Sequence, residues 1–507
     1  MGVRQEKFMF NLKRFIGFLK ILLSQPRGAL GIGVIALFVF VAAFAPMFTP
    51  HDPYHDEYRA GDYSAPIWVR MFPGQAHYSQ NLVVVNDPKF VSSVAIGEWN
   101  IAVSDAYARV NTSFCSVYGD PQSGPGCLII EYNRKAGEPA KTIEVSFEKQ
   151  FNYSYIDSPK RFSANFSILP MEVKDLRELQ LQIGVNRVNN DGTSDKYTIY
   201  SQRFSGSSNI WSMPTEADSY SSKVRDAFGG NVDPSKAIFN STISKTYTFV
   251  LKFIIADYDS DKDVNLAVLV DGVSLTLYGN SFGLLGTDQV GRDIFSQLVY
   301  GARVSLWVGL LSAVLSVGIG LVIGVVAGYV GSVVDEALMR FTDMLLVLPG
   351  LPLLLVLIAV LGPSMWNLIL LIGLLGWMGF ARISRAQVLS LKERPFIEAA
   401  KSVGAGKSYI IFRHIIPNVI SLVYVSLALS VPSAILSEAA LSWLGLFDPT
   451  VVSWGRMLHD AMAFERSVEK WWWIVPPGVC IAILSLSFIM IGYAIDDILN
   501  PKLRRRR

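Results

Sequence analysis

One polar segment has the residue types that could bind a nucleotide. Residues 404–408 read GAGKS, which is similar to the end of a phosphate-binding loop. Such a loop requires a first glycine separated from Gly406 by four residues, and that position holds Lys401. No buried parallel strand is predicted ahead of it. We therefore expect ATP to bind elsewhere, and since no Ser/His/Asp or Cys/His arrangement indicates hydrolysis, we expect no enzyme activity.

An alternating acidic run offers a second possible chemistry, the binding of calcium. It resembles the start of a calcium loop and consists of Asp257, Asp259, Asp261 and Asp263. The match is incomplete, because Lys262 stands at the sharp-turn glycine and Val268 at the final bidentate glutamate. A solvated turn between strands is favoured over a calcium site. No other cofactor is expected on this chain.

Residues 398–417 have the pattern of a docking surface rather than a reactive site. Pro395 suits a first helical turn, Ala399 and Ala400 leave a flat face beside Glu398, and Gly404 can end the helix in the left-handed conformation. A second short helix is expected up to Pro417, with an apolar side interleaved with basic residues (Ile410, Ile411, Ile415; Lys407, Arg413, His414). It could lie along a membrane surface and present one face to a cytosolic partner. An ordinary amphipathic connector is the alternative.

The elements that position this segment are predicted to be transmembrane helices. The chain has 507 residues and is 51% hydrophobic although it carries a large polar block, which is typical of a membrane protein with an added soluble domain. Apolar stretches long enough to cross a bilayer occur near 28–49, 304–330, 341–361, 365–383, 417–437 and 472–494. We therefore predict six helices in contact with membrane lipid. Glycines 309, 318, 320, 324 and 328 would allow close helix packing or simple flexibility.

Basic residues predict the orientation in the plasma membrane. Lys and Arg gather in the N-terminal segment 1–27, in the loop 384–416 and in the tail 498–507, which are all expected on the cytoplasmic side. The net charge of +3 thus hides a strong asymmetry. A nucleic-acid-binding tail is not favoured beside a membrane helix. The first helix, 28–49, is expected to remain as an anchor, and the block 50–280 is expected outside the cell.

The block 50–280 is predicted to be an independent all-β domain, a sandwich or jelly roll. Its apolar residues alternate in several runs, at 142–147, 166–168, 179–183, 197–200 and 247–249. Near the end of the block, the continuous apolar run 266–270 is followed by Asp271-Gly272, and apolar and polar residues alternate again at 273–277. This pattern predicts a hairpin with a two-residue turn.

Two covalent modifications are expected if this block lies outside. Cys115 and Cys127 are close in sequence, and an oxidising location favours a disulfide between them over free buried thiols. Four Asn-x-Ser/Thr triplets are glycosylation candidates, and all fall in the same block (Asn111, Asn152, Asn165, Asn240).

Residues on both sides of the second helix closely resemble one transporter family. Residues 285–306 read LGTDQVGRDIFSQLVYGARVSL and contain the motif residues Gly286, Thr287, Asp288, Gly291, Arg292, Asp293, Gly301 and Arg303. This segment, the loop at Glu398 and the stretches 327–329, 335–343, 437–445 and 453–455 resemble the C-type permease subunit of dipeptide/oligopeptide ABC transporters. The resemblance is loose over 8–60 and close over 281–505.

The resemblance implies a type I importer fold, with a permease core at 281–497. It implies three kinds of partner: a second homologous permease, two cytosolic ATPases that bind ATP and Mg²⁺, and a substrate-binding protein outside. It assigns ATPase coupling to Glu398, Ala399, Ala400, Gly404, Ile415 and Pro417. The solutes would be peptides or related compounds such as oligosaccharides. The inserted block departs from the family, which leaves a membrane-anchored glycan-binding receptor or adhesion protein as the alternative.

Overall fold

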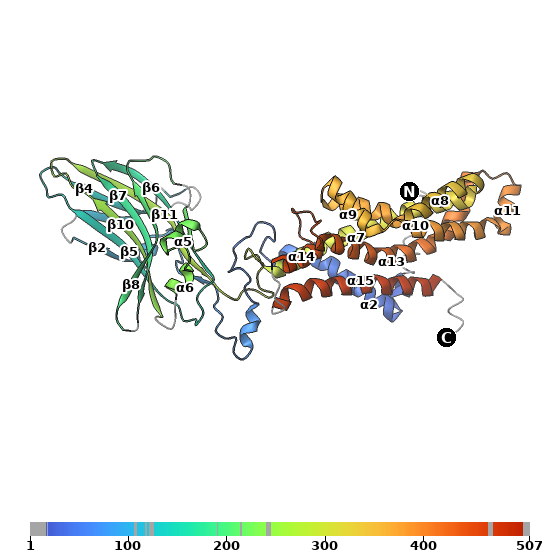
Figure 1. Ribbon diagram of the computed structural model, residues 1–507, viewed down its shortest axis with the longest axis horizontal. Helices are drawn as coiled ribbons and strands as arrows, with labels where there is room; N and C mark the ends of the chain where they lie inside the picture. Colours follow the sequence, from blue (N-terminus) through green and yellow to red (C-terminus); the bar gives the residue numbers. More distant parts are fainter. Residues whose placement is uncertain are drawn as a thin grey trace, which may run out of the picture. The chain divides into compact units, whose positions relative to one another are not determined.

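A computed structural model describes residues 17, 19–105, 109–116, 119–120, 126–189, 191–212, 215–239, 245–464 and 470–499. They form two compact units (Figure 1). The first unit contains the residues up to Asp56 and those from Asp293 onward, and the second contains Glu57–Arg292. The first unit is helical and the second is rich in β-strands. Most of the predicted cytoplasmic ends, residues 1–16 and 500–507, lie outside the described residues.

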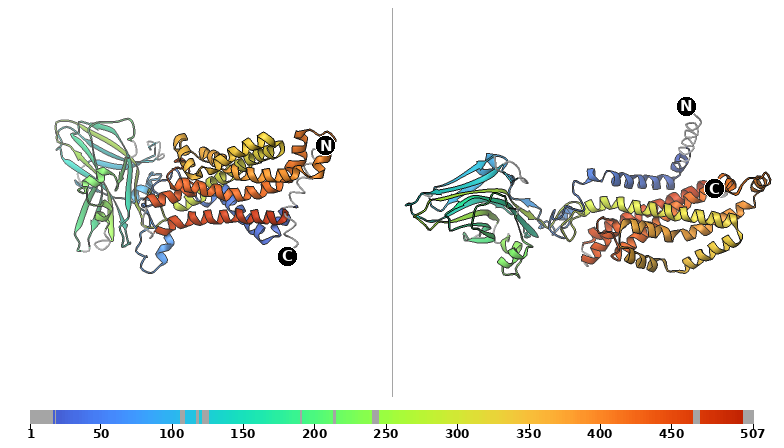
Figure 2. Two further views of the ribbon diagram at one scale, coloured as in Figure 1. Left: turned by 45° about the vertical axis from the view of Figure 1, so that its right-hand side comes forward. Right: turned by 90° about the horizontal axis from the view of Figure 1, so that it is seen from above.

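The helical unit consists of long apolar helices that run alongside one another (Figure 2). Its described elements are α2 (Pro26–Ala43), α3 (Ala45–Phe48), α7 (Ile294–Val330), α8 (Ser332–Val347), α9 (Gly350–Leu361), α10 (Met365–Lys392), α11 (Pro395–Ser402), α12 (Lys407–Ile410), the π-helix η2 (Ile411–Ile415), α13 (Ile416–Trp443), α14 (Trp454–Phe464) and α15 (Trp471–Leu499).

Five described helical stretches are long and apolar enough to cross a membrane, and a bent pair could form a sixth span. The prediction of one helix at 341–361 is wrong, because α8 and α9 meet at an angle of 87°. Pro349 is the N-cap of α9, and Leu348 before it is extended, with ψ of 134°. A proline disfavours the helical conformation in the residue before it and has no N–H to continue the preceding helix, so the chain turns at this point.

Glycines allow neighbouring helices to approach α7 closely. A Cβ atom at Gly324 would lie 1.7 Å from Ser384 Oγ and 2.5 Å from the Ala381 carbonyl oxygen on α10. Gly320 faces the same helix in a similar way. The expectation of close packing is not met at Gly318, where a Cβ atom would have no neighbour within 4 Å.

The second unit is built from two antiparallel sheets. One has the order β3-β4-β11-β6-β9, with β1 also paired to β11, and the other has the order β2-β5-β10-β7-β8. The strands are β1 (Leu82–Val83), β2 (Asn100–Val103), β3 (Val110–Cys115), β4 (Cys127–Arg134), β5 (Thr142–Asn152), β6 (Arg161–Lys174), β7 (Glu178–Val188), β8 (Ser194–Phe204), β9 (Thr215–Asp218), β10 (Thr246–Ala256) and β11 (Val264–Tyr278). The short helix η1 (Ile67–Met71) precedes the first strand, and the short helices α4 (Ser93–Gly97), α5 (Ser222–Ala227) and α6 (Pro234–Ile238) lie in connections between strands.

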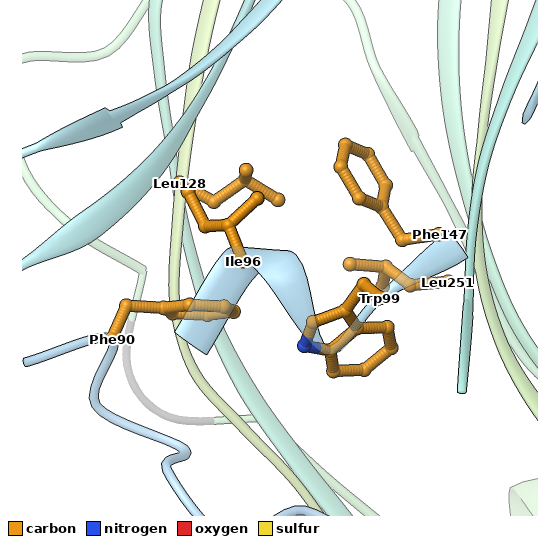
Figure 3. A pocket seen from close by; sticks show the side chains of 6 residues that line it. All are labelled: Phe90, Ile96, Trp99, Leu128, Phe147 and Leu251. Atoms are coloured by element: carbon orange, nitrogen blue, oxygen red, sulfur yellow. The ribbon is translucent and has the colours of Figure 1, made fainter. Parts of the chain in front are cut away.

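Side chains of both sheets contribute to one hydrophobic core. In β7, burial alternates with the period of two that the sequence shows, because Leu179, Leu181 and Ile183 are fully buried and their neighbours are not. Beside Trp99 this core contains an apolar gap (Figure 3). The gap leaves no space for a water molecule, so the packed centre of the unit is not a ligand site.

The predicted hairpin at Asp271-Gly272 is wrong. β11 continues through these residues and pairs with β6 from Asn265 to Tyr278, with a shift in register between Asp271 and Ser274. Gly272 adopts a φ of 64°, and the Asp271 carboxylate accepts hydrogen bonds from the amides of Gly272 (2.6 Å) and Asp120 (2.9 Å). The Asp-Gly pair is therefore a bulge in a continuous strand.

Candidate functional site

The segment predicted to dock a partner begins as α11. Gly404 ends this helix with a φ of 84°, its amide donates to the Lys401 carbonyl oxygen (2.9 Å), and the Ala405 amide donates to the Ala400 carbonyl oxygen (3.0 Å). These bonds are typical of a helix end closed by a left-handed residue, as predicted. The turn leaves Glu398 and Ala399 exposed on one side of the segment.

The second helix of this segment is not a separate surface helix. α12 continues through the π-helix η2 directly into α13. Pro417 lies in the first turn of α13, and a proline has no N–H for the preceding turn. The single π turn before it lets the helix continue without that bond.

The apolar side of α12 and η2 faces the helix bundle. Ile410 and Ile415 are fully buried in a cluster with Val325 of α7 and Val388 of α10, and Ile397 of α11 joins the same cluster. This packing fixes the segment to the two central helices of the unit. The opposite side presents exposed side chains that include Val403 (87% exposed), Tyr409 (57%) and Phe412 (73%). Exposed apolar residues beside a packed support are typical of a protein-binding surface.

The residues GAGKS at 404–408 do not form a nucleotide site. They occupy the turn between α11 and the start of α12, and no strand precedes them. A phosphate-binding loop needs a strand, a glycine-rich turn and a helix in that order. The structure therefore agrees with the sequence that this similarity is coincidental.

A cavity of about 500 Å³ lies among α7, α9, α10 and α13. Its polar wall consists of serines on two helices: Ser312 and Ser316 of α7, and Ser426, Ser430, Ser433 and Ser437 of α13. The α13 serines recur every three or four residues and so follow one face of that helix. The remaining lining is apolar or glycine, and no ionisable side chain contributes to it. No sequence motif predicts this wall, because single serines spaced along a helix are common.

The predicted motif before the second long helix forms a tight connection. Gly286 and Gly291 have φ of 74° and 80°, and a Cβ atom at Gly286 would lie 2.1 Å from the Ser64 carbonyl oxygen. Thr287 Oγ1 donates to the Gly61 carbonyl oxygen (2.6 Å) and accepts from the Ser64 amide (2.9 Å). These residues join the two segments through which the chain enters and leaves the β unit.

The other motif residues order this connection and the start of α7. The Asp288 carboxylate accepts from the Arg292 amide (2.9 Å), and Arg292 also pairs with Glu57. Asp293 caps α7 and accepts from the Ser296 amide (3.0 Å). Gly301 leaves room for Trp454, whose Cδ1 atom would lie 3.0 Å from a Cβ there. Arg303 donates to the Ala43 carbonyl oxygen (3.2 Å) at the end of α2.

Charged groups inside the helical unit were not identified as partners from the sequence. Asp335 of α8 receives two hydrogen bonds from Arg385 of α10 (2.5 and 2.7 Å). Glu438 of α13 is only 2% exposed, and one of its carboxylate oxygens accepts from Ser442 (2.8 Å) and Ser453 (2.6 Å). Glu438 is therefore a buried, hydrogen-bonded carboxylate. The Asp335–Arg385 pair joins two helices that are distant in sequence, and Glu438 bonds to Ser453 beyond the end of its own helix, neither of which a single sequence shows.

In the part of the chain that the structure describes, the carboxylates of the acidic run are held by an ion pair and turn hydrogen bonds instead of gathering around one point. Asp257 is fully buried and pairs with Arg134 (2.5 Å), and it also accepts from the Tyr132 hydroxyl (2.9 Å). The carboxylate of Asp259 accepts from the Asp261 amide (3.1 Å), and that of Asp263 accepts from the Ala136 amide (2.7 Å). The described residues contain no group of three or more potential ligands that could hold a metal ion. The incomplete loop match is thus explained by a buried ion pair and turn hydrogen bonds.

The two predicted modifications have different outcomes. Cys115 and Cys127 lie directly opposite each other on β3 and β4, but no disulfide joins them in the structure, so the predicted disulfide is absent. Burial raises the pKa of the Cys127 thiol. Asn111 and Asn152 are exposed, Asn165 is half-buried in the middle of β6, and Asn240 lies outside the described residues. Glycosylation at these sites stays a prediction.

Comparison with known protein families gives two matches along the helical part. Residues 320–505 match the profile of the binding-protein-dependent transport system inner membrane component. Residues 15–66 match the N-terminal transmembrane domain of oligopeptide transport permease C. These two ranges flank the β unit and leave most of it unmatched.

Individual relatives agree with these matches. A dipeptide transport system permease protein of Bacillus subtilis is 38% identical over 221 residues, which are 43% of this chain and 69% of that protein. A dipeptide transport system permease protein of Escherichia coli is 42% identical over 228 residues, which are 45% of this chain and 75% of that protein. The similarity thus covers most of each relative and less than half of this chain.

Solved structures resemble each unit only distantly. A methionine ABC transporter covers 41% of this chain, with 18% identity and a TM-score of 0.33. A family 22 carbohydrate-binding module of Clostridium thermocellum also covers 41%, with 12% identity and a TM-score of 0.24. At such low TM-scores, neither likeness says anything about the function of this chain.

Proposed function

Because the chain belongs to the family of C-type permease subunits of dipeptide and oligopeptide ABC transporters, we propose that it forms part of the membrane pathway of an ATP-driven peptide importer. The observation that supports coupling most directly is the surface of α11, with Glu398 and Ala399 exposed beside the turn at Gly404. The subunit itself is not an enzyme and catalyses no covalent reaction.

The conformational change that ATP drives in the ATPases would be transmitted to this chain through α11 and the residues that follow it. A cytosolic ATPase would contact the exposed side of this segment, while the buried side is fixed to α7 and α10 through Ile397, Ile410 and Ile415. A displacement of the docked ATPase would therefore move the two central helices as a body rather than bend a loop. Glu398, Ala399, Ala400 and Gly404 shape the contact, whereas Ile415 and Pro417 join it to the bundle.

The serine-lined cavity would contribute to the solute pathway. Hydroxyl groups can donate and accept hydrogen bonds without adding charge, so this wall suits the amides of a peptide backbone regardless of side-chain charge. The hydroxyls of an oligosaccharide would suit it as well, and the cavity does not discriminate between the two classes. Peptides are preferred because the relatives named above are dipeptide permeases.

The assembly would contain the partners typical of a type I importer. We propose a second homologous permease, two ATPases that bind ATP with Mg²⁺, and an extracytoplasmic substrate-binding protein. The basic segments would lie in the cytoplasm, and the β unit, a two-sheet sandwich, would lie outside. An anchored receptor is not favoured, because an anchor has no use for an exposed coupling surface fixed to its central helices.

Coupling is tested by uptake of labelled dipeptides in cells that depend on this transporter. We expect Glu398→Lys combined with Gly404→Pro to abolish uptake, since the double change reverses a charge and breaks the turn at the docking surface. Glu336→Lys is the matched control, because Glu336 is an exposed carboxylate on α8 outside the segment. Unchanged uptake in the double variant at normal membrane levels would rule out coupling through α11.

The pathway is tested separately with a bulky residue in the serine wall. Ser433→Phe should reduce uptake while the ATPases still co-purify, because the ring would occupy the cavity and leave α11 untouched. Val322→Phe provides the control, since Val322 is 63% exposed on α7 and does not line the cavity. Equal uptake by both variants would exclude this cavity from the pathway.

A further inference from the structure

The β unit carries an exposed apolar patch that its own core does not explain. The Trp68 patch, as we call it, consists of Ile67, Trp68, Met71, Phe72 and Leu284. Met71 is 86% exposed, Phe72 56%, Leu284 55% and Ile67 42%. Large apolar side chains that gather on one surface indicate an interaction site more often than scattered ones do.

Two segments that are far apart in sequence build this patch. The Ile67 amide donates to the Gly283 carbonyl oxygen (3.0 Å), and Trp68 Nε1 donates to the Leu284 carbonyl oxygen (2.8 Å). The Trp68 and Phe72 rings meet edge to face, with centroids 6.1 Å apart. The short helix η1 and the 281–287 turn therefore present their apolar side chains together.

The two segments that build the patch carry little charge of their own. Residues 63–80 and 279–287 contain no Asp or Glu, and Arg70 is the only Lys or Arg among them. The Arg70 guanidinium lies over the Tyr155 ring, 5.5 Å from its centroid. A surface with tryptophan, phenylalanine, aliphatic side chains and a single cation has the composition of a segment at the membrane–water interface, where headgroups are often anionic.

The chain keeps the patch within reach of the membrane. Only residues 285–293 separate Leu284 from Ile294, the first residue of α7, which limits their separation to about 35 Å. At that end of the helical unit, Ser296 Oγ and Thr49 Oγ1 lie 2.5 Å apart. Phe44, Met47 and Phe48, just before Thr49, are 44%, 81% and 45% exposed, so the apolar outer surface extends to the start of α7.

We propose that the Trp68 patch binds the lipid–water interface of the outer leaflet and thereby attaches the β unit to the membrane surface. Met71, Phe72 and Leu284 would enter the boundary between headgroups and acyl chains, as the apolar face of an interfacial helix does. Trp68 would lie at headgroup level. The β unit would thus be held by its lipid contacts as well as by its two chain connections.

The proposal is tested with a nitroxide spin label on Met71→Cys in the full-length chain. The chain is reconstituted in nanodiscs of phosphatidylethanolamine and phosphatidylglycerol, and the label is exposed to oxygen or to a water-soluble nickel complex. Ile210→Cys is the control site, because Ile210 is 78% exposed in the same unit and outside the patch. Labelled protein without an added cysteine supplies the background from the three native thiols.

We expect the ratio of oxygen to nickel accessibility at Met71 to exceed that at Ile210 severalfold. A Leu284→Cys label, on the other segment of the patch, should behave like Met71. Equal ratios at Met71 and Ile210 would refute the proposal, because the patch would then lie in water. Labels shielded from both reagents would also refute it and would indicate a protein partner instead.

Discussion

Asp271 makes the β unit less stable as the pH rises. A carboxylate in a favourable ion pair has the opposite effect and makes a protein more stable as the pH rises. The residue is fully buried in the bulge of β11. Burial, with a contribution from the nearby Asp120 carboxylate, raises the pKa of its carboxyl group to about 6. The hydrogen bonds from the amides of Asp120 and Gly272 only partly offset these effects.

The size of the effect follows from the difference between the folded and unfolded pKa values. The folded value is about two units above the ordinary value of 3.8, and each unit corresponds to about 1.4 kcal/mol. The folded unit binds the Asp271 proton more tightly than the unfolded chain, so the contribution of this group to stability is largest below pH 3.8 and is lost as the pH rises through 6. The total loss is about 3 kcal/mol, of which roughly half falls between about pH 5 and pH 7.5.

Hydrogen exchange of the full-length chain in nanodiscs measures this loss. After correction for intrinsic exchange rates, the opening free energy of amides in β11 and β4 should fall by about 1.4 kcal/mol from about pH 5 to pH 7.5. Asp271→Asn should remove most of that slope, because the amide does not titrate. An equally steep slope in the variant would show that another group is responsible, and a slope of opposite sign would refute the reasoning.

Three further predictions concern packing, thiol chemistry and the buried carboxylate. Gly324→Ala should lower the thermal unfolding temperature of the membrane unit, because a Cβ atom there would overlap α10, whereas Gly318→Ala should not. A mild oxidant should join Cys115 and Cys127 in a disulfide, and so block their alkylation, without unfolding the β unit, since they face each other on paired strands. Alkylation of both thiols after oxidation would argue against that register. Glu438→Ala should destabilise the membrane unit by about 1–3 kcal/mol, because the hydroxyls that donate to Glu438 lose a buried acceptor. Glu438→Gln should retain most of the stability, because the amide oxygen can still accept. Equal losses of stability in the two variants would contradict this reason.

The sequence predicted the elements whose signal is local. The alternation of apolar and polar residues predicted strands at 142–147, 179–183 and 247–249, and the structure has β5, β7 and β10 there. Apolar length predicted the membrane helices, apart from the bend at Pro349. The turn at Gly404 was predicted from glycine's freedom to adopt positive φ, and the structure confirms it.

Other features depend on contacts between distant residues and were therefore missed. Asp271-Gly272 has the sequence of a hairpin turn, but β6 pairs along both sides of it and keeps the strand continuous. The helix after Gly404 was predicted to end before α13, yet the π turn carries it through Pro417. The buried position of Glu438 depends on Ser453, which lies 15 residues further along the chain.

The central claim, that this chain is the membrane subunit of a coupled importer, is tested most directly by gentle purification from its native membrane followed by mass spectrometry. We expect a second permease and two ATPases to co-purify with the chain, and the Glu398→Lys/Gly404→Pro variant to lose the ATPases while keeping the second permease. Recovery of the chain alone, under conditions that keep other membrane complexes intact, would contradict the account and favour an anchored receptor.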